Sequence, residues 1–189
     1  MPSYNRSFLG FTLIELLIAL AIISIALSLT VGSFPMIERY NVEHNARNVV
    51  NAVMYSRSLA IKEGNSVFLC PSKNSSTCDK TWSNKILVYK NNNSDKTFDQ
   101  GDDLLQVYSL ESDAILIRWG SFQRKDYLEF RANGMSNYQN GTFTVCHTNR
   151  DTTTAIPIII NVAGRPYFGR DKNNDGIREY SSGKPVKCS

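Results

Sequence analysis

The chain has 189 residues, of which 42% are hydrophobic and 20% are charged, and its formal net charge is +4. This modest positive charge does not by itself indicate a nucleic-acid-binding protein. Because one long helical pattern occupies the first third of the chain, the remainder has room for a single compact domain of about 120 residues.

The first part of the chain contains a long apolar segment, residues 11–34, with a single ionisable residue, Glu15. A helix that spans a membrane needs about 20 apolar residues, whereas the apolar core of a secretory signal has only about 7 to 15. The length therefore favours a transmembrane helix over a cleavable secretory signal. Residues 1–10, which include Arg6, form a short polar leader before it.

Residues 35–64 have a different pattern, because apolar side chains recur at helical intervals with polar side chains between them. This pattern predicts an amphipathic helix that stops at Gly64 and Asn65. We expect the apolar and amphipathic segments to form one long helix. A kink is expected where Gly32 and Pro35 weaken its hydrogen bonds.

Beyond Gly64 the apolar period falls to two, in short runs rich in β-branched and aromatic residues. Turn-forming residues fill the segments 91–103 and 131–141 between these runs. The sequence therefore predicts an α+β protein, in which an antiparallel β-sheet head of residues 65–189 packs on the amphipathic half of the helix. The predicted strands are residues 67–70, 86–89, 104–108, 114–119, 127–130, 142–146 and 156–162.

Four cysteines, Cys70, Cys78, Cys146 and Cys188, all lie in the predicted head. An even number in an exported domain suggests two disulfides, for which three pairings are possible. Proximity in the chain favours Cys70 with Cys78, which leaves Cys146 with Cys188 to hold the C-terminal tail to a strand. Free thiols and a zinc site are the alternatives, but the CxxC pairs and histidines typical of zinc sites are missing from the spacing.

The start of the apolar segment, GFTLIELLIALAII at residues 10–23, resembles the type IV pilin and pseudopilin family. The resemblance implies that a prepilin peptidase cuts after Gly10 and N-methylates Phe11, which places Glu15 at the fifth position of the mature chain. A carboxylate within hydrocarbon costs a few kcal/mol and needs a partner. The freed amine of Phe11 on an incoming subunit is the expected partner of Glu15. The alternatives are that Glu15 lies among lipid headgroups and that Gly10 is a simple helix boundary.

Later segments resemble the minor pilin and pseudopilin group that includes FimT, FimU and GspH. These segments are residues 56–72, 98–108, 131–146 and 158–168, followed by a final cysteine. For FimT-like proteins the resemblance implies DNA capture through a basic C-terminal tail that is marked by a Gly-Arg motif.

In this chain Gly164 and Arg165 match the beginning of that motif, and Tyr167 or Phe168 could stack on bases. A solvated charged tail is the alternative interpretation. The residues that could neutralise DNA phosphates are Arg165, Arg170, Arg178, Lys184 and Lys187.

No metal, cofactor or catalytic site is expected. Residues 171–179 resemble the start of a calcium loop, but Glu179 comes too early for the twelfth-position ligand, so a polar turn is the better interpretation. The same holds for Asp99, Asp102 and Asp103. His44 and His147 belong to no recognisable triad or metal motif.

The sequence therefore predicts a minor type IV pilin that spans the bacterial inner membrane once, with its head in the periplasm, before entering a pilus. Its expected partners are the prepilin peptidase and other pilin subunits. The alternatives are a GspH-like pseudopilin of a type II secretion system and a DNA-binding minor pilin for natural transformation.

Overall fold

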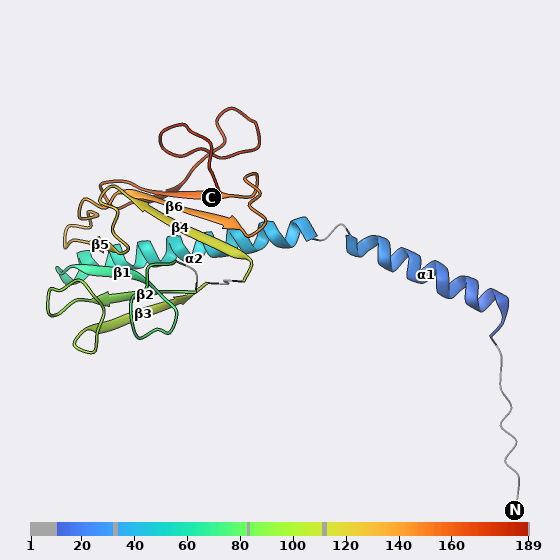
Figure 1. The fold of residues 1–189 in the computed structure, drawn as a ribbon, viewed down its shortest axis with the longest axis horizontal. Coiled ribbons are helices and arrows are strands. Elements are labelled where there is room, and N and C mark those ends of the chain that lie inside the picture. Colours follow the sequence, from blue (N-terminus) through green and yellow to red (C-terminus); the bar gives the residue numbers. More distant parts are fainter. Residues whose placement is uncertain (1–10, 32–33, 83, 111–112, 189) are drawn as a thin grey trace, which may run out of the picture. The chain divides into compact units, whose positions relative to one another are not determined.

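The computed structural model describes residues 11–31, 34–82, 84–110 and 113–188 (Figure 1). Two helices come first, α1 (Leu13–Val31) and α2 (Phe34–Glu63). The predicted single helix is thus described as two, and the predicted leader with Gly10, as well as the predicted kink residue Gly32, lies outside the described residues. The chain divides into two compact units, Met1–Ile37 and Glu38–Ser189.

Within the described residues, no helix is both long and apolar enough to cross a membrane.

The head part of α2 is amphipathic, as its periodicity predicts. Val42, Ala46, Val49, Val53 and Ala60 are fully or almost fully buried. Their spacing of three and four residues puts them on one face of the helix. The helix ends at Glu63, because the next residue, Gly64, has a φ of +67° and closes the last turn in the left-handed conformation.

Eight strands in the described residues form two antiparallel sheets of four strands each. The first sheet has the order β3–β2–β1–β5, with β1 at Val67–Ser72, β2 at Lys85–Lys90, β3 at Asp103–Ser109 and β5 at Leu128–Phe130. The second has the order β4–β6–β7–β8, with β4 at Ile115–Ser121, β6 at Gly141–His147, β7 at Ile156–Ile160 and β8 at Pro166–Phe168.

All seven predicted strands are present, and the α+β fold class is confirmed. Two features differ from the prediction, because the strands form two sheets instead of one and β8 is an additional strand. Alternation identifies which side chains are buried, but it does not identify which strands pair. β8 has only three residues and begins with Pro166, which lacks the backbone N–H of a ladder.

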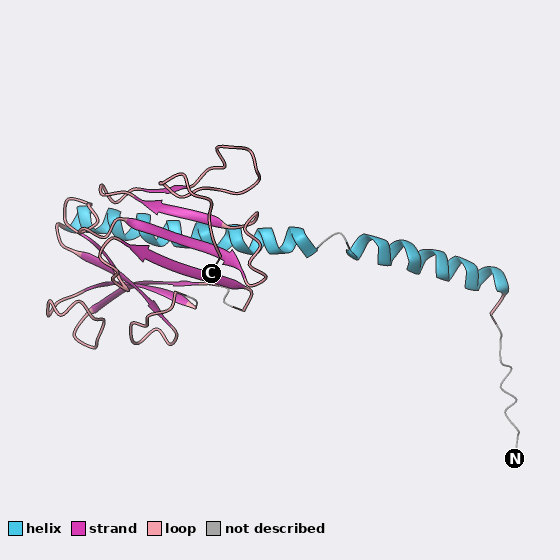
Figure 2. Ribbon diagram, turned by 45° about the horizontal axis from the view of Figure 1, so that its top comes forward, coloured by secondary structure: helices cyan, strands magenta, loops and turns pink. Residues whose placement is uncertain are grey.

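The main core lies between α2 and the two sheets, which flank this helix in Figures 1 and 2. The buried face of α2 meets apolar side chains of β1 and β2 on one side and of β4, β6 and β7 on the other. Aromatic rings fill part of the space, with Phe143 centred 4.8 Å from Trp82 and 4.2 Å from Trp119. Such close aromatic contacts bury much surface in a small volume.

The last part of the chain, residues 169–188, is called here the C-terminal lobe. An antiparallel bridge joins Glu179 to Pro185, and Val186 is buried beside Cys146 and Ala155 in a small separate core. The lobe is thus attached to the second sheet by packing as well as by the chain that continues from β8.

Candidate functional site

The start of α1 places Glu15 in a capping arrangement. The backbone N–H of Glu15 donates to Thr12 Oγ1 at 3.3 Å, and that of Leu16 donates to the Thr12 carbonyl at 3.2 Å. A Thr-x-x-Glu sequence before an apolar run is typical of a helix N-terminus, where an acidic side chain also faces the positive end of the helix dipole. This local role of Glu15 at the helix N-terminus is additional to its predicted pairing with Phe11. Phe11 is 82% exposed.

Both disulfides are present in the head. Cys70 is bonded to Cys78 with a Cα–Cα distance of 5.6 Å, and Cys146 to Cys188 with a distance of 5.9 Å. These are the pairings that proximity in the chain favours. The first closes the loop after β1, and the second joins the end of the C-terminal lobe to β6.

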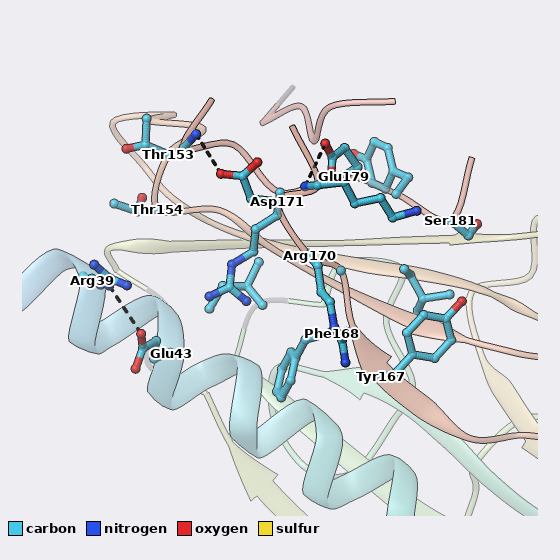
Figure 3. Close-up of a pocket in the computed structure, with 17 residues that line it drawn as sticks. Arg39, Glu43, Thr153, Thr154, Tyr167, Phe168, Arg170, Asp171, Glu179 and Ser181 are labelled. Carbon is cyan, nitrogen blue, oxygen red and sulfur yellow. Dashed lines mark hydrogen bonds and ion pairs between the residues drawn. The ribbon is translucent and has the colours of Figure 1, made fainter. Parts of the chain in front are cut away.

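A cavity of about 980 Å³ opens beside β8 (Figure 3). It is bounded by the first turns of α2 in the head, by β7 and β8, and by the C-terminal lobe. Tyr167 and Phe168 contribute exposed aromatic rings, and Ile156 and Ile159 contribute apolar side chains. Its charged residues are Arg39, Glu43, Arg170, Asp171, Lys172, Arg178 and Glu179.

The acidic side chains of this cavity already have partners. Glu43 is paired with Arg39 at 3.4 Å. Asp171 accepts hydrogen bonds from the backbone N–H groups of Asn174 and Gly176, each at 2.8 Å. Glu179 accepts from the backbone N–H of Lys172 at 3.0 and 3.3 Å. These bonds hold the turn of the lobe, and dashed lines in Figure 3 mark bonds at Asp171 and Glu179.

Three of the four basic side chains of the cavity behave differently. Within the described part of the chain, the side chains of Arg170, Lys172 and Arg178 make no ion pair and no hydrogen bond. Arg170 and Lys172 are exposed and Arg178 is half-buried. The cavity therefore offers positive charge beside apolar and aromatic surface.

Two known sequence profiles match the chain. Residues 45–164 match the family described as Type II transport protein GspH, and residues 5–31 match the Prokaryotic N-terminal methylation motif. The first match extends over more than half of the 189 residues. The chain belongs to the GspH family.

Solved structures of similar fold include two minor subunits. The type IV minor pilin FimU of Pseudomonas aeruginosa PAO1 matches this GspH-family chain with a TM-score of 0.55 and 20% identity, over 78% of this chain and 99% of that one. The minor pseudopilin EpsH of the Vibrio cholerae Type 2 Secretion System matches with a TM-score of 0.50 and 8% identity, over 68% and 95%. No curated protein sequence matches.

These matches confirm the resemblance to type IV pilins and pseudopilins and the pilin fold. The chain is a minor pilin or pseudopilin, which is a structural subunit. Members of this family are not known as enzymes.

The five basic residues predicted to contact DNA lie in different places on the GspH-family head. Arg170 and Arg178 line the cavity beside β8. Arg165 is exposed at the β7–β8 turn, where its carbonyl accepts from the backbone N–H of Asn161 at 3.2 Å. Lys187 lines a different hollow of about 360 Å³, and Lys184 is exposed in the turn after Tyr180. The structure thus brings only two of the five to one cavity, and DNA binding stays a prediction.

The acidic loop between β2 and β3 gathers Asp95, Asp99 and Asp102, whose carboxylate oxygens lie within 4.8 Å of one another. Each accepts a backbone N–H of the loop at 2.7 to 2.8 Å, from Thr97, Gly101 and Asn92 respectively. The Thr97 N–H, followed by the Asn91 side chain, holds the pKa of Asp95 below its usual value. These carboxylates therefore shape the loop that connects the two strands.

The two histidines lie on different elements. His44, on α2, stacks on Tyr40 with ring centroids 6.1 Å apart. His147, at the end of β6, accepts the backbone N–H of Asn149 on Nδ1 at 3.3 Å. Each imidazole thus has a contact within its own element or the adjoining turn.

Proposed function

We propose that this chain is a minor type IV pilin. Prepilin peptidase removes the leader after Gly10 and methylates Phe11, and the processed subunit enters a pilus whose assembly it supports. The observation that carries this proposal is the N-terminal methylation motif at residues 5–31 in the same chain as a GspH-family head at residues 45–164.

Before assembly, the subunit is held in the inner membrane by residues 11–34, with its head in the periplasm. The periplasm is oxidising, which suits a head that contains two disulfides. In the filament, the Glu15 carboxylate meets the amine of Phe11 on a neighbouring subunit. This pairing compensates the cost of keeping the carboxylate in apolar surroundings.

The second candidate is a pseudopilin of a type II secretion system. The match to the family described as Type II transport protein GspH favours it. The two candidates share the processing site, the helix and the head, so they differ only in the machine that the subunit joins.

The test uses two variants of the full chain in its own bacterium. Gly10→Val should leave the uncleaved precursor in the membrane, because the peptidase needs the small residue at the cleavage site. Glu15→Leu should be cleaved normally but should be missing from sheared filaments. The matched control is Thr12→Val, which removes the capping hydrogen bond to the Glu15 N–H but keeps the carboxylate.

Normal filament entry of Glu15→Leu would contradict the proposed pairing. Deletion of the whole gene separates the two candidates. Loss of surface pili with normal protein secretion supports the pilin, and loss of secretion with normal pili supports the pseudopilin.

A further inference from the structure

β8 is the last strand of the second sheet, and no strand of the described residues lies beyond it. The Asn161 N–H donates to the Arg165 carbonyl at 3.2 Å, and the Gly169 N–H donates to the Pro157 carbonyl at 2.8 Å. In an antiparallel strand, every second residue forms its backbone hydrogen bonds with the same neighbouring strand, and the residues between them face the other way. Phe168, one residue before Gly169, therefore directs its backbone N–H and C=O away from β7. The next outward-facing position, Arg170, already accepts the backbone N–H of Glu179 on its carbonyl at 3.0 Å. The unpaired part of this edge is thus the Phe168 position.

The side chains beside this edge are suited to an apolar or aromatic ligand group. Tyr167 is 47% exposed and Phe168 is 39% exposed, and both line the cavity of Figure 3. Because successive strand residues point to opposite faces, the two rings lie on either side of the sheet edge. A chain that lay along β8 would thus have an aromatic surface on each face.

The charges of the cavity indicate carboxylates as the polar groups of the ligand. Arg170 and Arg178 have no acidic partner within the described residues, whereas Glu43, Asp171 and Glu179 are occupied by their own partners. A guanidinium that has no partner and lines a cavity can bind a carboxylate through a bidentate pair of hydrogen bonds.

The same charges disfavour nucleic acid at this cavity. Four basic residues and three acidic residues line it, so its net positive charge is too small to neutralise a strand that carries a phosphate at every nucleotide. A peptide carries its carboxylates on separate side chains, between apolar ones, and fits this alternation of charge and aromatic surface.

We propose that the cavity beside β8 binds an extended acidic peptide segment of a neighbouring filament subunit by strand addition. The segment pairs its backbone with Phe168, places carboxylates on Arg170 and Arg178, and packs apolar side chains on the exposed rings. The identity of the partner as a filament subunit rests on the proposed function, while the chemistry of the cavity does not.

The test measures the binding of labelled hexapeptides to the purified full chain in detergent by fluorescence anisotropy. The first peptide alternates glutamate and leucine, the second alternates glutamine and leucine, and the third is the first with N-methylated backbone amides. A single-stranded oligothymidylate is the nucleic-acid probe. The receptor variants are Arg170→Gln with Arg178→Gln and, as the matched control, Arg165→Gln outside the cavity.

The proposal expects the glutamate peptide alone to bind. The double variant should weaken its binding about tenfold or more at unchanged Tm, and the Arg165→Gln control should leave it unchanged. The N-methylated peptide should fail, because it cannot pair with a strand edge. Absence of glutamate-peptide binding, equal binding by the double variant, or oligothymidylate binding that depends on the two arginines would overturn the proposal. None of these results depends on processing at Gly10 or on Glu15.

Discussion

At the scale of single residues, Gly164 has a packing reason to be a glycine. Its φ is +73°, and a Cβ there would lie 2.3 Å from the Gly134 carbonyl oxygen and 2.8 Å from the Phe130 ring. In the sequence this glycine begins the Gly-Arg pair that resembles a DNA-capture motif. The close backbone approach accounts for the glycine without nucleic acid, so only Arg165 of the pair bears on DNA binding.

Replacement of Gly164 tests this packing. Gly164→Ala should be destabilising by more than Gly176→Ala, because both positions have a left-handed φ but only Gly164 has close neighbours. The left-handed conformation alone costs about 1 to 2 kcal/mol, and the contact at Gly164 adds to it. Urea unfolding followed by tryptophan fluorescence measures the difference. Equal losses would show that the Gly134 contact relaxes freely.

Tyr89 is a buried phenol with a pH-dependent contribution to stability. Its ring is fully buried, and its hydroxyl donates to the Lys96 carbonyl at 3.1 Å. Burial, assisted by nearby Asp102, raises the pKa of Tyr89 above its ordinary value. The unfolded chain therefore releases this proton at a lower pH than the folded chain does. The contribution is complete below pH 10 or so and is lost as the pH rises further.

Tyr89→Phe should cost about 1 kcal/mol at neutral pH, because the hydrogen bond to Lys96 is removed. Above about pH 10 the difference from the natural protein should shrink, since the variant has no phenol to ionise on unfolding. Urea unfolding at a series of pH values measures this trend. A difference that stays constant to high pH would contradict the assigned cause.

At the scale of elements, α2 organises the head through its apolar face and through the polar side chain of Arg57. Its apolar face packs on both sheets, and Arg57 connects two turns that are far apart in the chain. The Arg57 Nε–H group is shared between the Gly134 carbonyl at 3.1 Å and the Ala163 carbonyl at 3.2 Å. These turns follow β5 and β7, so Arg57 links the helix to both sheets at this end of the head.

The two disulfides should differ in their contribution to stability. Cys146 and Cys188 are 42 residues apart, and Cys70 and Cys78 are 8 apart. In the chain-entropy account the longer loop is worth about 4 kcal/mol and the shorter about 2.5 kcal/mol. Replacing both members of each pair with serine, and measuring unfolding in urea, tests this order.

Limited proteolysis distinguishes the structural effects of losing each disulfide. Loss of the Cys146–Cys188 bond should expose residues 169–188 to cleavage, whereas loss of the Cys70–Cys78 bond should leave the C-terminal lobe protected. Protection of the lobe in both variants would show that packing around Val186 holds it without the disulfide.

At the scale of the whole molecule, the head is a self-contained unit. The main core begins at Val42 on α2 and, within the described part of the chain, uses no residue before it. Residues 38–189, expressed without the preceding segment, should therefore fold with a Tm within a few degrees of that of the full chain. A collapsed or unfolded product would show that residues 11–37 contribute to the stability of the head.

The sequence by itself determined the element types and the local chemistry. Seven strands, the amphipathic helix with its stop at Gly64, and the N-terminal processing motif depend on side-chain periodicity and on neighbours within a few residues. The cap between Thr12 and Glu15 was equally readable, because it is a contact across three positions.

Only the tertiary structure decided how these elements combine. The division into two sheets, the short strand β8, and the placement of Arg170 and Arg178 but not Arg165 at one cavity all depend on contacts between residues far apart in the chain. Local patterns specify which face of a strand is buried, while its partner is fixed by the packing of the complete core.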